Sequence, residues 1–468
     1  MSNMMMEETK LTILREMRLF LVVWVGQLIA LIGSTTTGFA LDLWVYNRTG
    51  SVTQFAFVSL FNTLPYALIS PIAGPLVDRW DRRKTMIIAD LLACLGTIAI
   101  GVLFIMGRLE VWHIYLANTF TAVFMAFHAP AYTASTVLLV PKQHLTRANG
   151  LMSLLYGISI IIAPTLGGIL LSIIHLQGII LLHIANVCIA VVSLMLVRFP
   201  QVNTTAIVTA KSSLLNEITY GFKYLIARPG LLGLMLFSAS SLYLVGGINV
   251  ITIPLVLNFA SVNVLGTIMS LFGIALLTGG LLMSIWGGLE RNVYAIYGCM
   301  LLNGIFIFIA GVQPSLIVFT VSIFLFSLTQ PIVSSSTQVV IQNKVEPSVQ
   351  GRIFALKGAI EATALPIGQI TIGALAEKVF EPLMATNSYF AESIGQIIGV
   401  GSGRGMGLLL MMMGVLTILG TSMAYLYPRL RFVEDELPNV SHAVAISADT
   451  IYRACDQLNP DPSESQAF

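Results

Sequence analysis

Long apolar runs alternate with short polar stretches along the whole chain. About a dozen of these runs approach the roughly 20 residues that an α-helix needs to cross a bilayer. We predict membrane spans at 18–41, 54–76, 85–106, 112–138, 149–174, 178–198, 230–257, 263–286, 294–312, 315–341, 353–376 and 405–427. Glu7, Glu8 and Glu16 precede the first run, which is too long for the core of a signal peptide, so we expect it to remain as the first helix.

The composition agrees with this pattern. Of 468 residues 56% are hydrophobic and 10% are charged, whereas about 25% of a soluble domain is charged. The mean hydropathy is +0.87. We therefore predict an all-α, multi-pass integral membrane protein. The net charge of +2 gives no argument for nucleic acid, and the four cysteines show no metal-ligand spacing, so we expect neither a metal nor a cofactor.

Basic residues are unevenly divided between alternate loops. Nineteen Lys and Arg residues fall on one side and four on the other, with Lys357 inside a span. The positive-inside rule places the richer side in the cytoplasm. Both termini are then cytoplasmic and the number of crossings is even, which fits twelve helices.

The chain divides into two halves around a polar linker. We predict a six-helix half at 1–198, a cytoplasmic linker with an amphipathic helix at 199–229, a second six-helix half at 230–427 and a polar tail at 428–468. The two halves echo each other, since Asp78-Arg79 recurs as Glu290-Arg291 and Arg147 as Arg352. Duplicated six-helix units are typical of secondary transporters that bind substrate near the midplane between the halves.

The segment GPLVDRWDRRK at 74–84 resembles the loop motif between helices 2 and 3 of the major facilitator superfamily. The matching residues are Gly74, Leu76, Asp78, Arg79, Arg82, Arg83 and Lys84. Asp81 replaces a glycine, a mild departure because aspartate tolerates the left-handed conformation better than most residues. The resemblance implies a major facilitator fold in which this cluster joins the halves on the cytoplasmic side. Gly74 then permits close helix approach, and Asp78 meets the N-terminus of the helix that begins near Arg352. The alternative is that the basic residues only fix the topology.

The segment SIIIAPTLGG at 159–168 resembles the antiporter motif of helix 5 in that superfamily. The corresponding residues are Ser159, Ala163, Pro164, Gly167 and Gly168. With VQGRIFAL at 349–356 and the segment 380–407, the chain resembles macrolide-efflux-like and siderophore-exporter-like drug/proton antiporters. This implies a monomer in a bacterial cytoplasmic (inner) membrane. One departure is that span 4 carries no arginine. Ordinary helix packing is the alternative explanation of the small residues.

Few ionisable residues lie inside the predicted spans, and such residues are costly enough to be functional candidates. Glu361 and Lys357 are one turn apart and form either a proton-coupling pair or a static ion pair. Asp42 is predicted to end the first helix on the outer side, either as a proton-coupling or substrate residue or as a solvated helix end. Asp90 is predicted to contact the motif arginines rather than to carry protons. Candidates for the substrate path are Gln27, Asn62, Phe127, His128, Tyr156, Tyr243, Asn249 and Gln369.

These features favour a proton-coupled exporter of an amphipathic small molecule, such as a drug, a macrolide-like compound or a siderophore. A nutrient importer and a lysolipid flippase of the same fold are alternatives, and a non-transporting scaffold or sensor is an alternative of another class. An enzyme is not expected, because no nucleophile and base set or phosphate loop is visible. The expected partners are the substrate, protons and the lipid bilayer.

Overall fold

The structure is a computed structural model in which residues 15–77, 79–197, 199, 222–286, 291–313, 315–384, 401 and 403–436 are described. These residues form helices and short connections, without a strand among them. The long helices are α2 (Arg18–Thr49), α3 (Val52–Val77), α4 (Arg82–Ile105), α5 (Val111–Leu139), α6 (Leu145–Leu196), α8 (Pro229–Leu257), α9 (Val262–Trp286), α10 (Asn292–Val312), α11 (Leu316–Lys344), α12 (Pro347–Leu375) and α16 (Arg404–Leu426). The short elements are η1 (Lys142–His144), η2 (Ala376–Phe380), α13 (Glu381–Leu383), α17 (Pro428–Arg431) and α18 (Val433–Glu436).

Helix α6 makes two crossings. Its 52 residues would extend to roughly 78 Å at 1.5 Å per residue, more than twice the bilayer core. The chain reverses at His175, whose φ of 56° is left-handed. Before the reversal, Trp24 and Thr35 of α2 bond to Leu151 and Ser159, so α6 runs parallel to α2. After it, Gly26 and Gly33 of α2 pack against Ser193 and Asn186, so the chain runs in the antiparallel direction. The eleven long helices therefore supply twelve crossings, as predicted, and the reversal falls next to the predicted break at 175–177.

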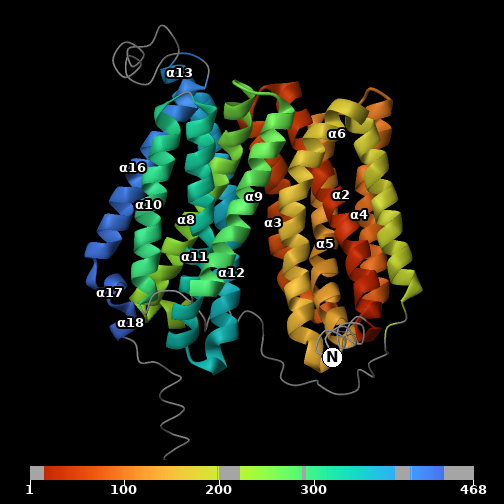
Figure 1. Cartoon of the computed structure of the whole chain (residues 1–468), viewed down its shortest axis with the longest axis horizontal. Coiled ribbons are helices and arrows are strands. Elements are labelled where there is room, and N and C mark those ends of the chain that lie inside the picture. The colour runs from red at the N-terminus through yellow and green to blue at the C-terminus, as the bar shows by residue number, and fades with distance from the viewer. Residues whose placement is uncertain are drawn as a thin grey trace, which may run out of the picture.

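The helices form two bundles that lie side by side (Figure 1). Helices α2 to α6 make the N-terminal bundle, and α8 to α16 make the C-terminal bundle. The bundles meet along two helix pairs, α3 with α12 and α6 with α9. Both pairs join elements at corresponding places in the two halves, which agrees with the duplicated architecture.

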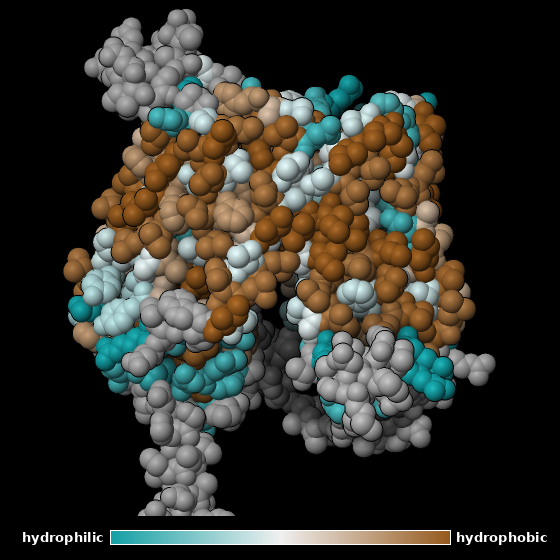
Figure 2. All heavy atoms as spheres, in the orientation of Figure 1, coloured by the Kyte–Doolittle hydropathy of each residue, from teal (hydrophilic) through white to brown (hydrophobic). Residues whose placement is uncertain are grey.

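The face of the two bundles seen in Figure 2 is apolar between two polar ends. Large aliphatic side chains of the helices are exposed, for example Ile285 at 84%, Ile105 at 75% and Leu426 at 76%. Exposure of this kind is stable against lipid tails and costly in water. Eleven helices in the described part of the chain are long and apolar enough to cross a membrane.

The two ends of the molecule differ in how the bundles meet. We call the end that carries the loop between α3 and α4 the basic end, and the other the opposite end. At the opposite end Glu377 of η2 accepts hydrogen bonds from Ser51 Oγ (2.8 Å) and Thr53 N (2.8 Å), which cap α3 across the seam. Gly168 also packs there against the carbonyl oxygen of Val262. At the basic end a hollow separates the bundles (Figure 2). The structure is therefore open at the basic end and closed at the opposite end.

The structure corrects one local prediction and explains a second position. Helix α2 continues to Thr49 and ends at Gly50, which caps it with a φ of 63°, so Asp42 lies about two turns inside the helix and not at its end. Asp81 is extended, with φ −68° and ψ 110°, and its side chain accepts a hydrogen bond from Lys84 N. It is thus an N-cap of α4, which explains an aspartate at this position without a left-handed backbone.

Candidate functional site

A cavity of about 490 Å³ lies inside the N-terminal bundle. Helices α2, α3, α4, α5 and both segments of α6 contribute to its wall. Its polar and aromatic lining residues are Gln27, Asn62, Thr63, Tyr66, Asp90, Asn118, His128, Tyr132, Tyr156 and His183, among others. Tyr156, which is half exposed, directly precedes Gly157, and the Leu277 side chain of α9 packs on that glycine. The cavity therefore lies beside the seam between the bundles.

Asp90 is the centre of a buried polar cluster in this cavity. Its Oδ2 accepts a hydrogen bond of 3.4 Å from Gln27 Nε2, and its Oδ1 lies 3.3 Å from His128 Nε2. The three residues come from α4, α2 and α5. Each lies roughly 12–16 Å from the basic end of its helix at 1.5 Å per residue, which is close to the middle of a bilayer core.

Several polar atoms in the cavity wall have no hydrogen-bond partner among the described residues. They are Tyr132 Oη, His183 Nδ1 and His128 Nε2, whose contact with Asp90 is not aligned as a hydrogen bond. Tyr132 and His183 are 4% and 7% exposed. Because buried polar groups are normally paired, these atoms are positioned to bind a ligand or water.

Asp90 was predicted to contact the motif arginines, and this prediction was wrong. Asp90 turns toward α2 and α5, whereas Arg83 Nε donates to the carbonyl oxygen of Leu194 at 2.8 Å, in the last turn of α6. The last-turn carbonyls of a helix have no intrahelical partner and attract cations, so they hold the arginine instead.

The predicted substrate-path residues divide into two groups. Gln27, Asn62, His128 and Tyr156 line the cavity. The others lie outside it: Phe127 stacks on Trp80 with ring centroids 5.8 Å apart, Tyr243 Oη shares a 2.8 Å hydrogen bond with Thr371 Oγ1, Asn249 is exposed, and Gln369 is buried.

The predicted pair of Lys357 and Glu361 is present in the C-terminal bundle. Lys357 Nζ lies 2.7 Å from Glu361 Oε1, and Ser238 Oγ of α8 donates to the same oxygen at 2.8 Å. Lys357 is 9% exposed. Glu361 is therefore held by two short contacts, whereas both contacts of Asp90 are long.

The charged motif is described except for Asp78, which lies outside the described residues. Arg79 and Lys84 are exposed, and Arg82 Nε is buried without a hydrogen-bond partner among the described residues. Gly74 has no atom within 4 Å of the position that a Cβ would take, so the close helix approach expected there is absent in this conformation. Arg352 lies in the second turn of α12.

The small residues of the antiporter-like motif face two neighbours. Ser159 Oγ shares a 3.0 Å hydrogen bond with Thr35, the Ala163 carbonyl accepts one from Thr36, and Gly167 packs on Phe39, all on α2. Pro164 and Gly168 instead face α9, where the Pro164 carbonyl oxygen packs against Gly266 and Gly168 meets Val262. The motif thus supports close packing both within the N-terminal bundle and across the seam.

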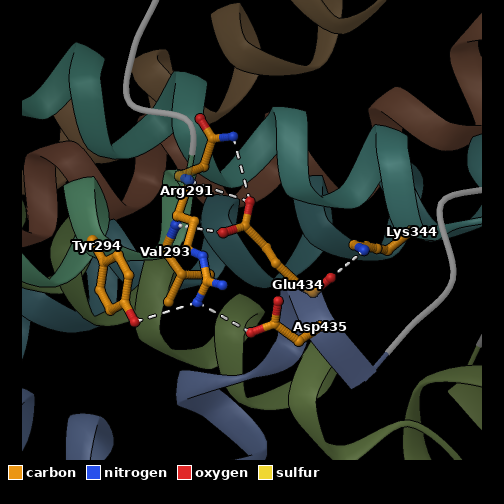
Figure 3. Close-up of polar contacts among 7 residues, drawn as sticks. Arg291, Val293, Tyr294, Lys344, Glu434 and Asp435 are labelled. Carbon is orange, nitrogen blue, oxygen red and sulfur yellow. Dashed lines mark hydrogen bonds and ion pairs between the residues drawn. The ribbon is translucent and has the colours of Figure 1, made fainter.

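Beyond Tyr427, the short helices α17 and α18 dock on the basic end of the C-terminal bundle (Figure 3). The Glu434 carboxylate accepts hydrogen bonds from Asn292 N and Val293 N, both 3.2 Å, at the start of α10. Asp435 pairs with Arg291 at 3.3 Å, and Lys344 Nζ donates to the Glu434 carbonyl oxygen. Glu434 and Asp435 lie within the predicted tail, whose residues 437–468 lie outside the described part of the chain.

Sequence reasoning missed three functional candidates, namely Tyr132, His183 and Glu377. Tyr132 and His183 fall in apolar runs, where the sequence shows no signal for a shared cavity. Glu377 carried one signal, an acidic residue near the outer end of a predicted span. The residues that the structure describes contain no group of three or more His, Cys, Asp or Glu side chains placed to hold a metal ion.

Comparison with known proteins gives consistent matches. A family model described as Major Facilitator Superfamily matches residues 23–368. Macrolide efflux protein A of Streptococcus pyogenes is 32% identical over 367 residues, which cover 77% of this chain and 90% of that protein. Enterobactin exporter EntS of Citrobacter koseri is 24% identical over 390 residues, 81% of this chain and 90% of that protein.

Solved structures with the same fold include a bacterial homologue of the human lysosomal transporter Spinster in an inward-facing, unoccupied conformation. Its TM-score is 0.64 at 14% sequence identity, over 90% of this chain and 98% of that one. The nucleoside transporter NupG matches with a TM-score of 0.68 at 14% identity, over 86% of this chain and 99% of that one. At such identities the likeness shows the fold alone.

Proposed function

Because the chain belongs to the major facilitator superfamily, we propose that it is a proton-driven exporter of amphipathic small molecules that works by alternating access. One observation carries the proposal most directly. A midplane cavity with a buried carboxylate lies beside the seam of two bundles that are apart at one end and joined at the other. Such an arrangement allows substrate to enter from one side and, after the bundles rock, to leave on the other.

The names of two relatives support export as the direction, and the distribution of charge gives the orientation of the molecule. Nineteen of the basic residues belong to the basic end and its predicted loops, which places that end in the cytoplasm. The hollow between the bundles therefore faces the cytoplasm in this conformation. The Streptococcus pyogenes and Citrobacter koseri relatives carry names of efflux and export proteins.

Proton coupling rests on the deep carboxylates. Asp90 and Glu361 both lie far from the helix ends, and each contacts a group that can compete with a proton. A carboxylate that loses its partner when helices move changes its proton affinity, because burial and nearby positive charge act on it in opposite directions. Both residues are therefore candidates for coupling.

The proposal is tested by reconstituting the purified protein in liposomes with an imposed pH gradient. We expect gradient-dependent movement of amphipathic compounds out of the compartment that the basic end faces. Collapse of the gradient with a protonophore should stop it. Movement in the reverse direction with the proton would indicate an importer, movement of lysolipid alone a flippase, and no gradient-dependent movement for any compound of a broad panel would contradict transport.

A further inference from the structure

The side chains that line the cavity of the N-terminal bundle also indicate the charge of its ligand. We propose that Asp90, together with His128 and Gln27, is a binding site for a protonated amine, so that the substrate is an amphiphile bearing an amine. This inference rests on the proposed exporter function and narrows its substrate class.

Asp90 has unused hydrogen-bonding capacity. A carboxylate offers about four lone-pair positions, and here two are met by contacts of 3.3 and 3.4 Å. Glu361 is a useful comparison, since an ammonium at 2.7 Å and a hydroxyl at 2.8 Å already hold one of its oxygens. A buried carboxylate gains much from a charge-assisted donor, so Asp90 is the more available of the two.

The charge of the cavity wall selects the sign of the ligand. Asp90 is the acidic residue among the described lining residues, and no Lys or Arg lines the cavity. With His128 neutral the cluster carries one negative charge, and with His128 protonated it carries none. In neither state does it offer a net positive charge to an anion, so a carboxylate- or catecholate-bearing siderophore lacks a counter-ion here.

The remainder of the wall fits an amphiphile. Tyr132 Oη and His183 Nδ1 are buried without hydrogen-bond partners in the described part of the chain and can hydrogen-bond polar atoms of a ligand. Leu31, Leu41 and Ile100 supply apolar surface on other parts of the wall. A volume of about 490 Å³ lies within the range of roughly 300–1,000 Å³ found for small-molecule sites.

An amine at Asp90 would compete with the proton for the same carboxylate. The titratable groups that face the cavity are His128 and Tyr132 from α5, Tyr66 from α3, Cys94 from α4, and Tyr156 and His183 from α6. Helix α2 contributes the neutral Gln27. Amine binding and protonation of Asp90 should therefore exclude each other, which provides one exchange step of an antiport cycle.

The test uses two fluorescent probes that differ in one charge, dansylcadaverine and its N-acetyl derivative. For the wild-type protein we expect the amine to bind at least roughly tenfold more tightly than the amide. Asp90→Asn should reduce this ratio to about twofold or less, while the control Glu381→Gln, which removes a carboxylate outside the cavity, should keep it. Equal binding of both probes, binding of neither, or an unchanged ratio in Asp90→Asn would overturn the amine site.

A second measurement needs no variant. In weakly buffered solution at mildly acidic pH, binding of dansylcadaverine to the wild-type protein should release protons, and binding of the acetylated probe should release none. Equal release by both probes would contradict the exchange. The liposome panel is independent, because gradient-driven export of neutral compounds without preference for amines would leave the exporter standing and remove only the amine site.

Discussion

Glu361 and Lys357 form the ion pair that their spacing of four residues predicts, and the contact of 2.7 Å leaves its role open to experiment. If Glu361 couples transport to protons, Glu361→Gln should abolish gradient-driven export and preserve substrate binding, because glutamine keeps the shape but cannot titrate. Transport in liposomes and binding to the purified protein measure the two effects separately.

A static pair would behave differently. Glu361→Gln would then strand Lys357 in a buried site and reduce the yield of folded protein, a loss that Lys357→Met in the same chain would restore. The double variant decides the question. If it still concentrates substrate against a gradient, Glu361 is not the coupling residue and Asp90 is the next to test.

Glu377 is a second carboxylate with a specific expected effect. It caps α3 across the seam at the opposite end, so Glu377→Gln should weaken closure there and increase the population that is open at that end. The matched control is Glu381→Gln, since Glu381 caps α16 within its own bundle through Gly403 N and Met406 N. Ala56 of α3 is 1% exposed and packs against Gly373 of α12 across the seam. Labelling of a cysteine introduced at Ala56 should rise in the first variant and not in the second; equal labelling would contradict a gating role.

The contacts of Asp90 could not be predicted from one sequence. Its depth in the membrane made it a candidate, but its partners Gln27 and His128 are 63 and 38 positions away along the chain. Helix periodicity identifies neighbours within a turn or two and carries no information on which faces of distant helices meet. Sequence proximity therefore favoured the nearby arginines, whereas in the structure Arg83 bonds to α6 and Asp90 contacts α2 and α5.

The end of α2 and the start of α4 each carry a capping residue that the sequence shows and that the prediction did not use. The predicted span ends at residue 41, but residues 42–49, which mix polar and apolar side chains, remain helical until Gly50. A glycine after a helical stretch is a common C-cap and could have placed this boundary. Asp81 directly before α4 was likewise an available N-cap signal.

The helix pair α6 and α9 allows a prediction for the conformation in which the basic end is closed. From the opposite end to beyond the middle of α9, Gly168 meets Val262, Gly266 meets Pro164 and Gly157 meets Leu277 in antiparallel register. Continuing this register toward the basic end places Gly150 opposite Gly280. Both glycines now have no atom within 4 Å of a Cβ position. We expect them to come into contact when the basic end closes.

Gly280→Leu should therefore hold the protein open at the basic end. Folding should be unaffected or improved, because the site is vacant here and leucine favours helix by about 1 kcal/mol over glycine. Transport should fall at least roughly tenfold. Gly420→Leu is the control, since Gly420 of α16 is also unobstructed and lies outside both seam helices. Equal transport by the two variants would contradict the predicted contact.

The start of α10 depends on a residue from the C-terminal segment. Its N-cap residue is Arg291, which provides no side-chain cap, and Glu434 accepts from the free N–H groups instead (Figure 3). Glu434→Ala should destabilise the C-terminal bundle by about 1 kcal/mol, the usual effect of losing a cap. A thermal unfolding series in detergent should show a lower midpoint than Asp435→Asn, whose ion pair is half exposed. Equal midpoints would exclude the capping role.

The two-bundle architecture was predictable because bilayer thickness fixes helix length and the positive-inside rule fixes parity. The reversal at His175 was also found in advance, since a run of 52 residues cannot cross once. The conformational state was not predictable. A sequence that works by alternating access must encode at least two packings of nearly equal free energy, and no local pattern selects between them.

The most direct test of alternating access measures distances between the bundles at both ends of one molecule. Spin labels at Gln143 and Gln342 report on the basic end, and labels at Arg108 and Gln313 report on the opposite end; all four residues are exposed. Pulsed dipolar spectroscopy should show opposite changes when pH or substrate is varied, with the basic-end distance shortening while the opposite-end distance lengthens. Distances that stay fixed at both ends, or that lengthen together, would contradict a transporter that alternates between a state closed at one end and a state closed at the other.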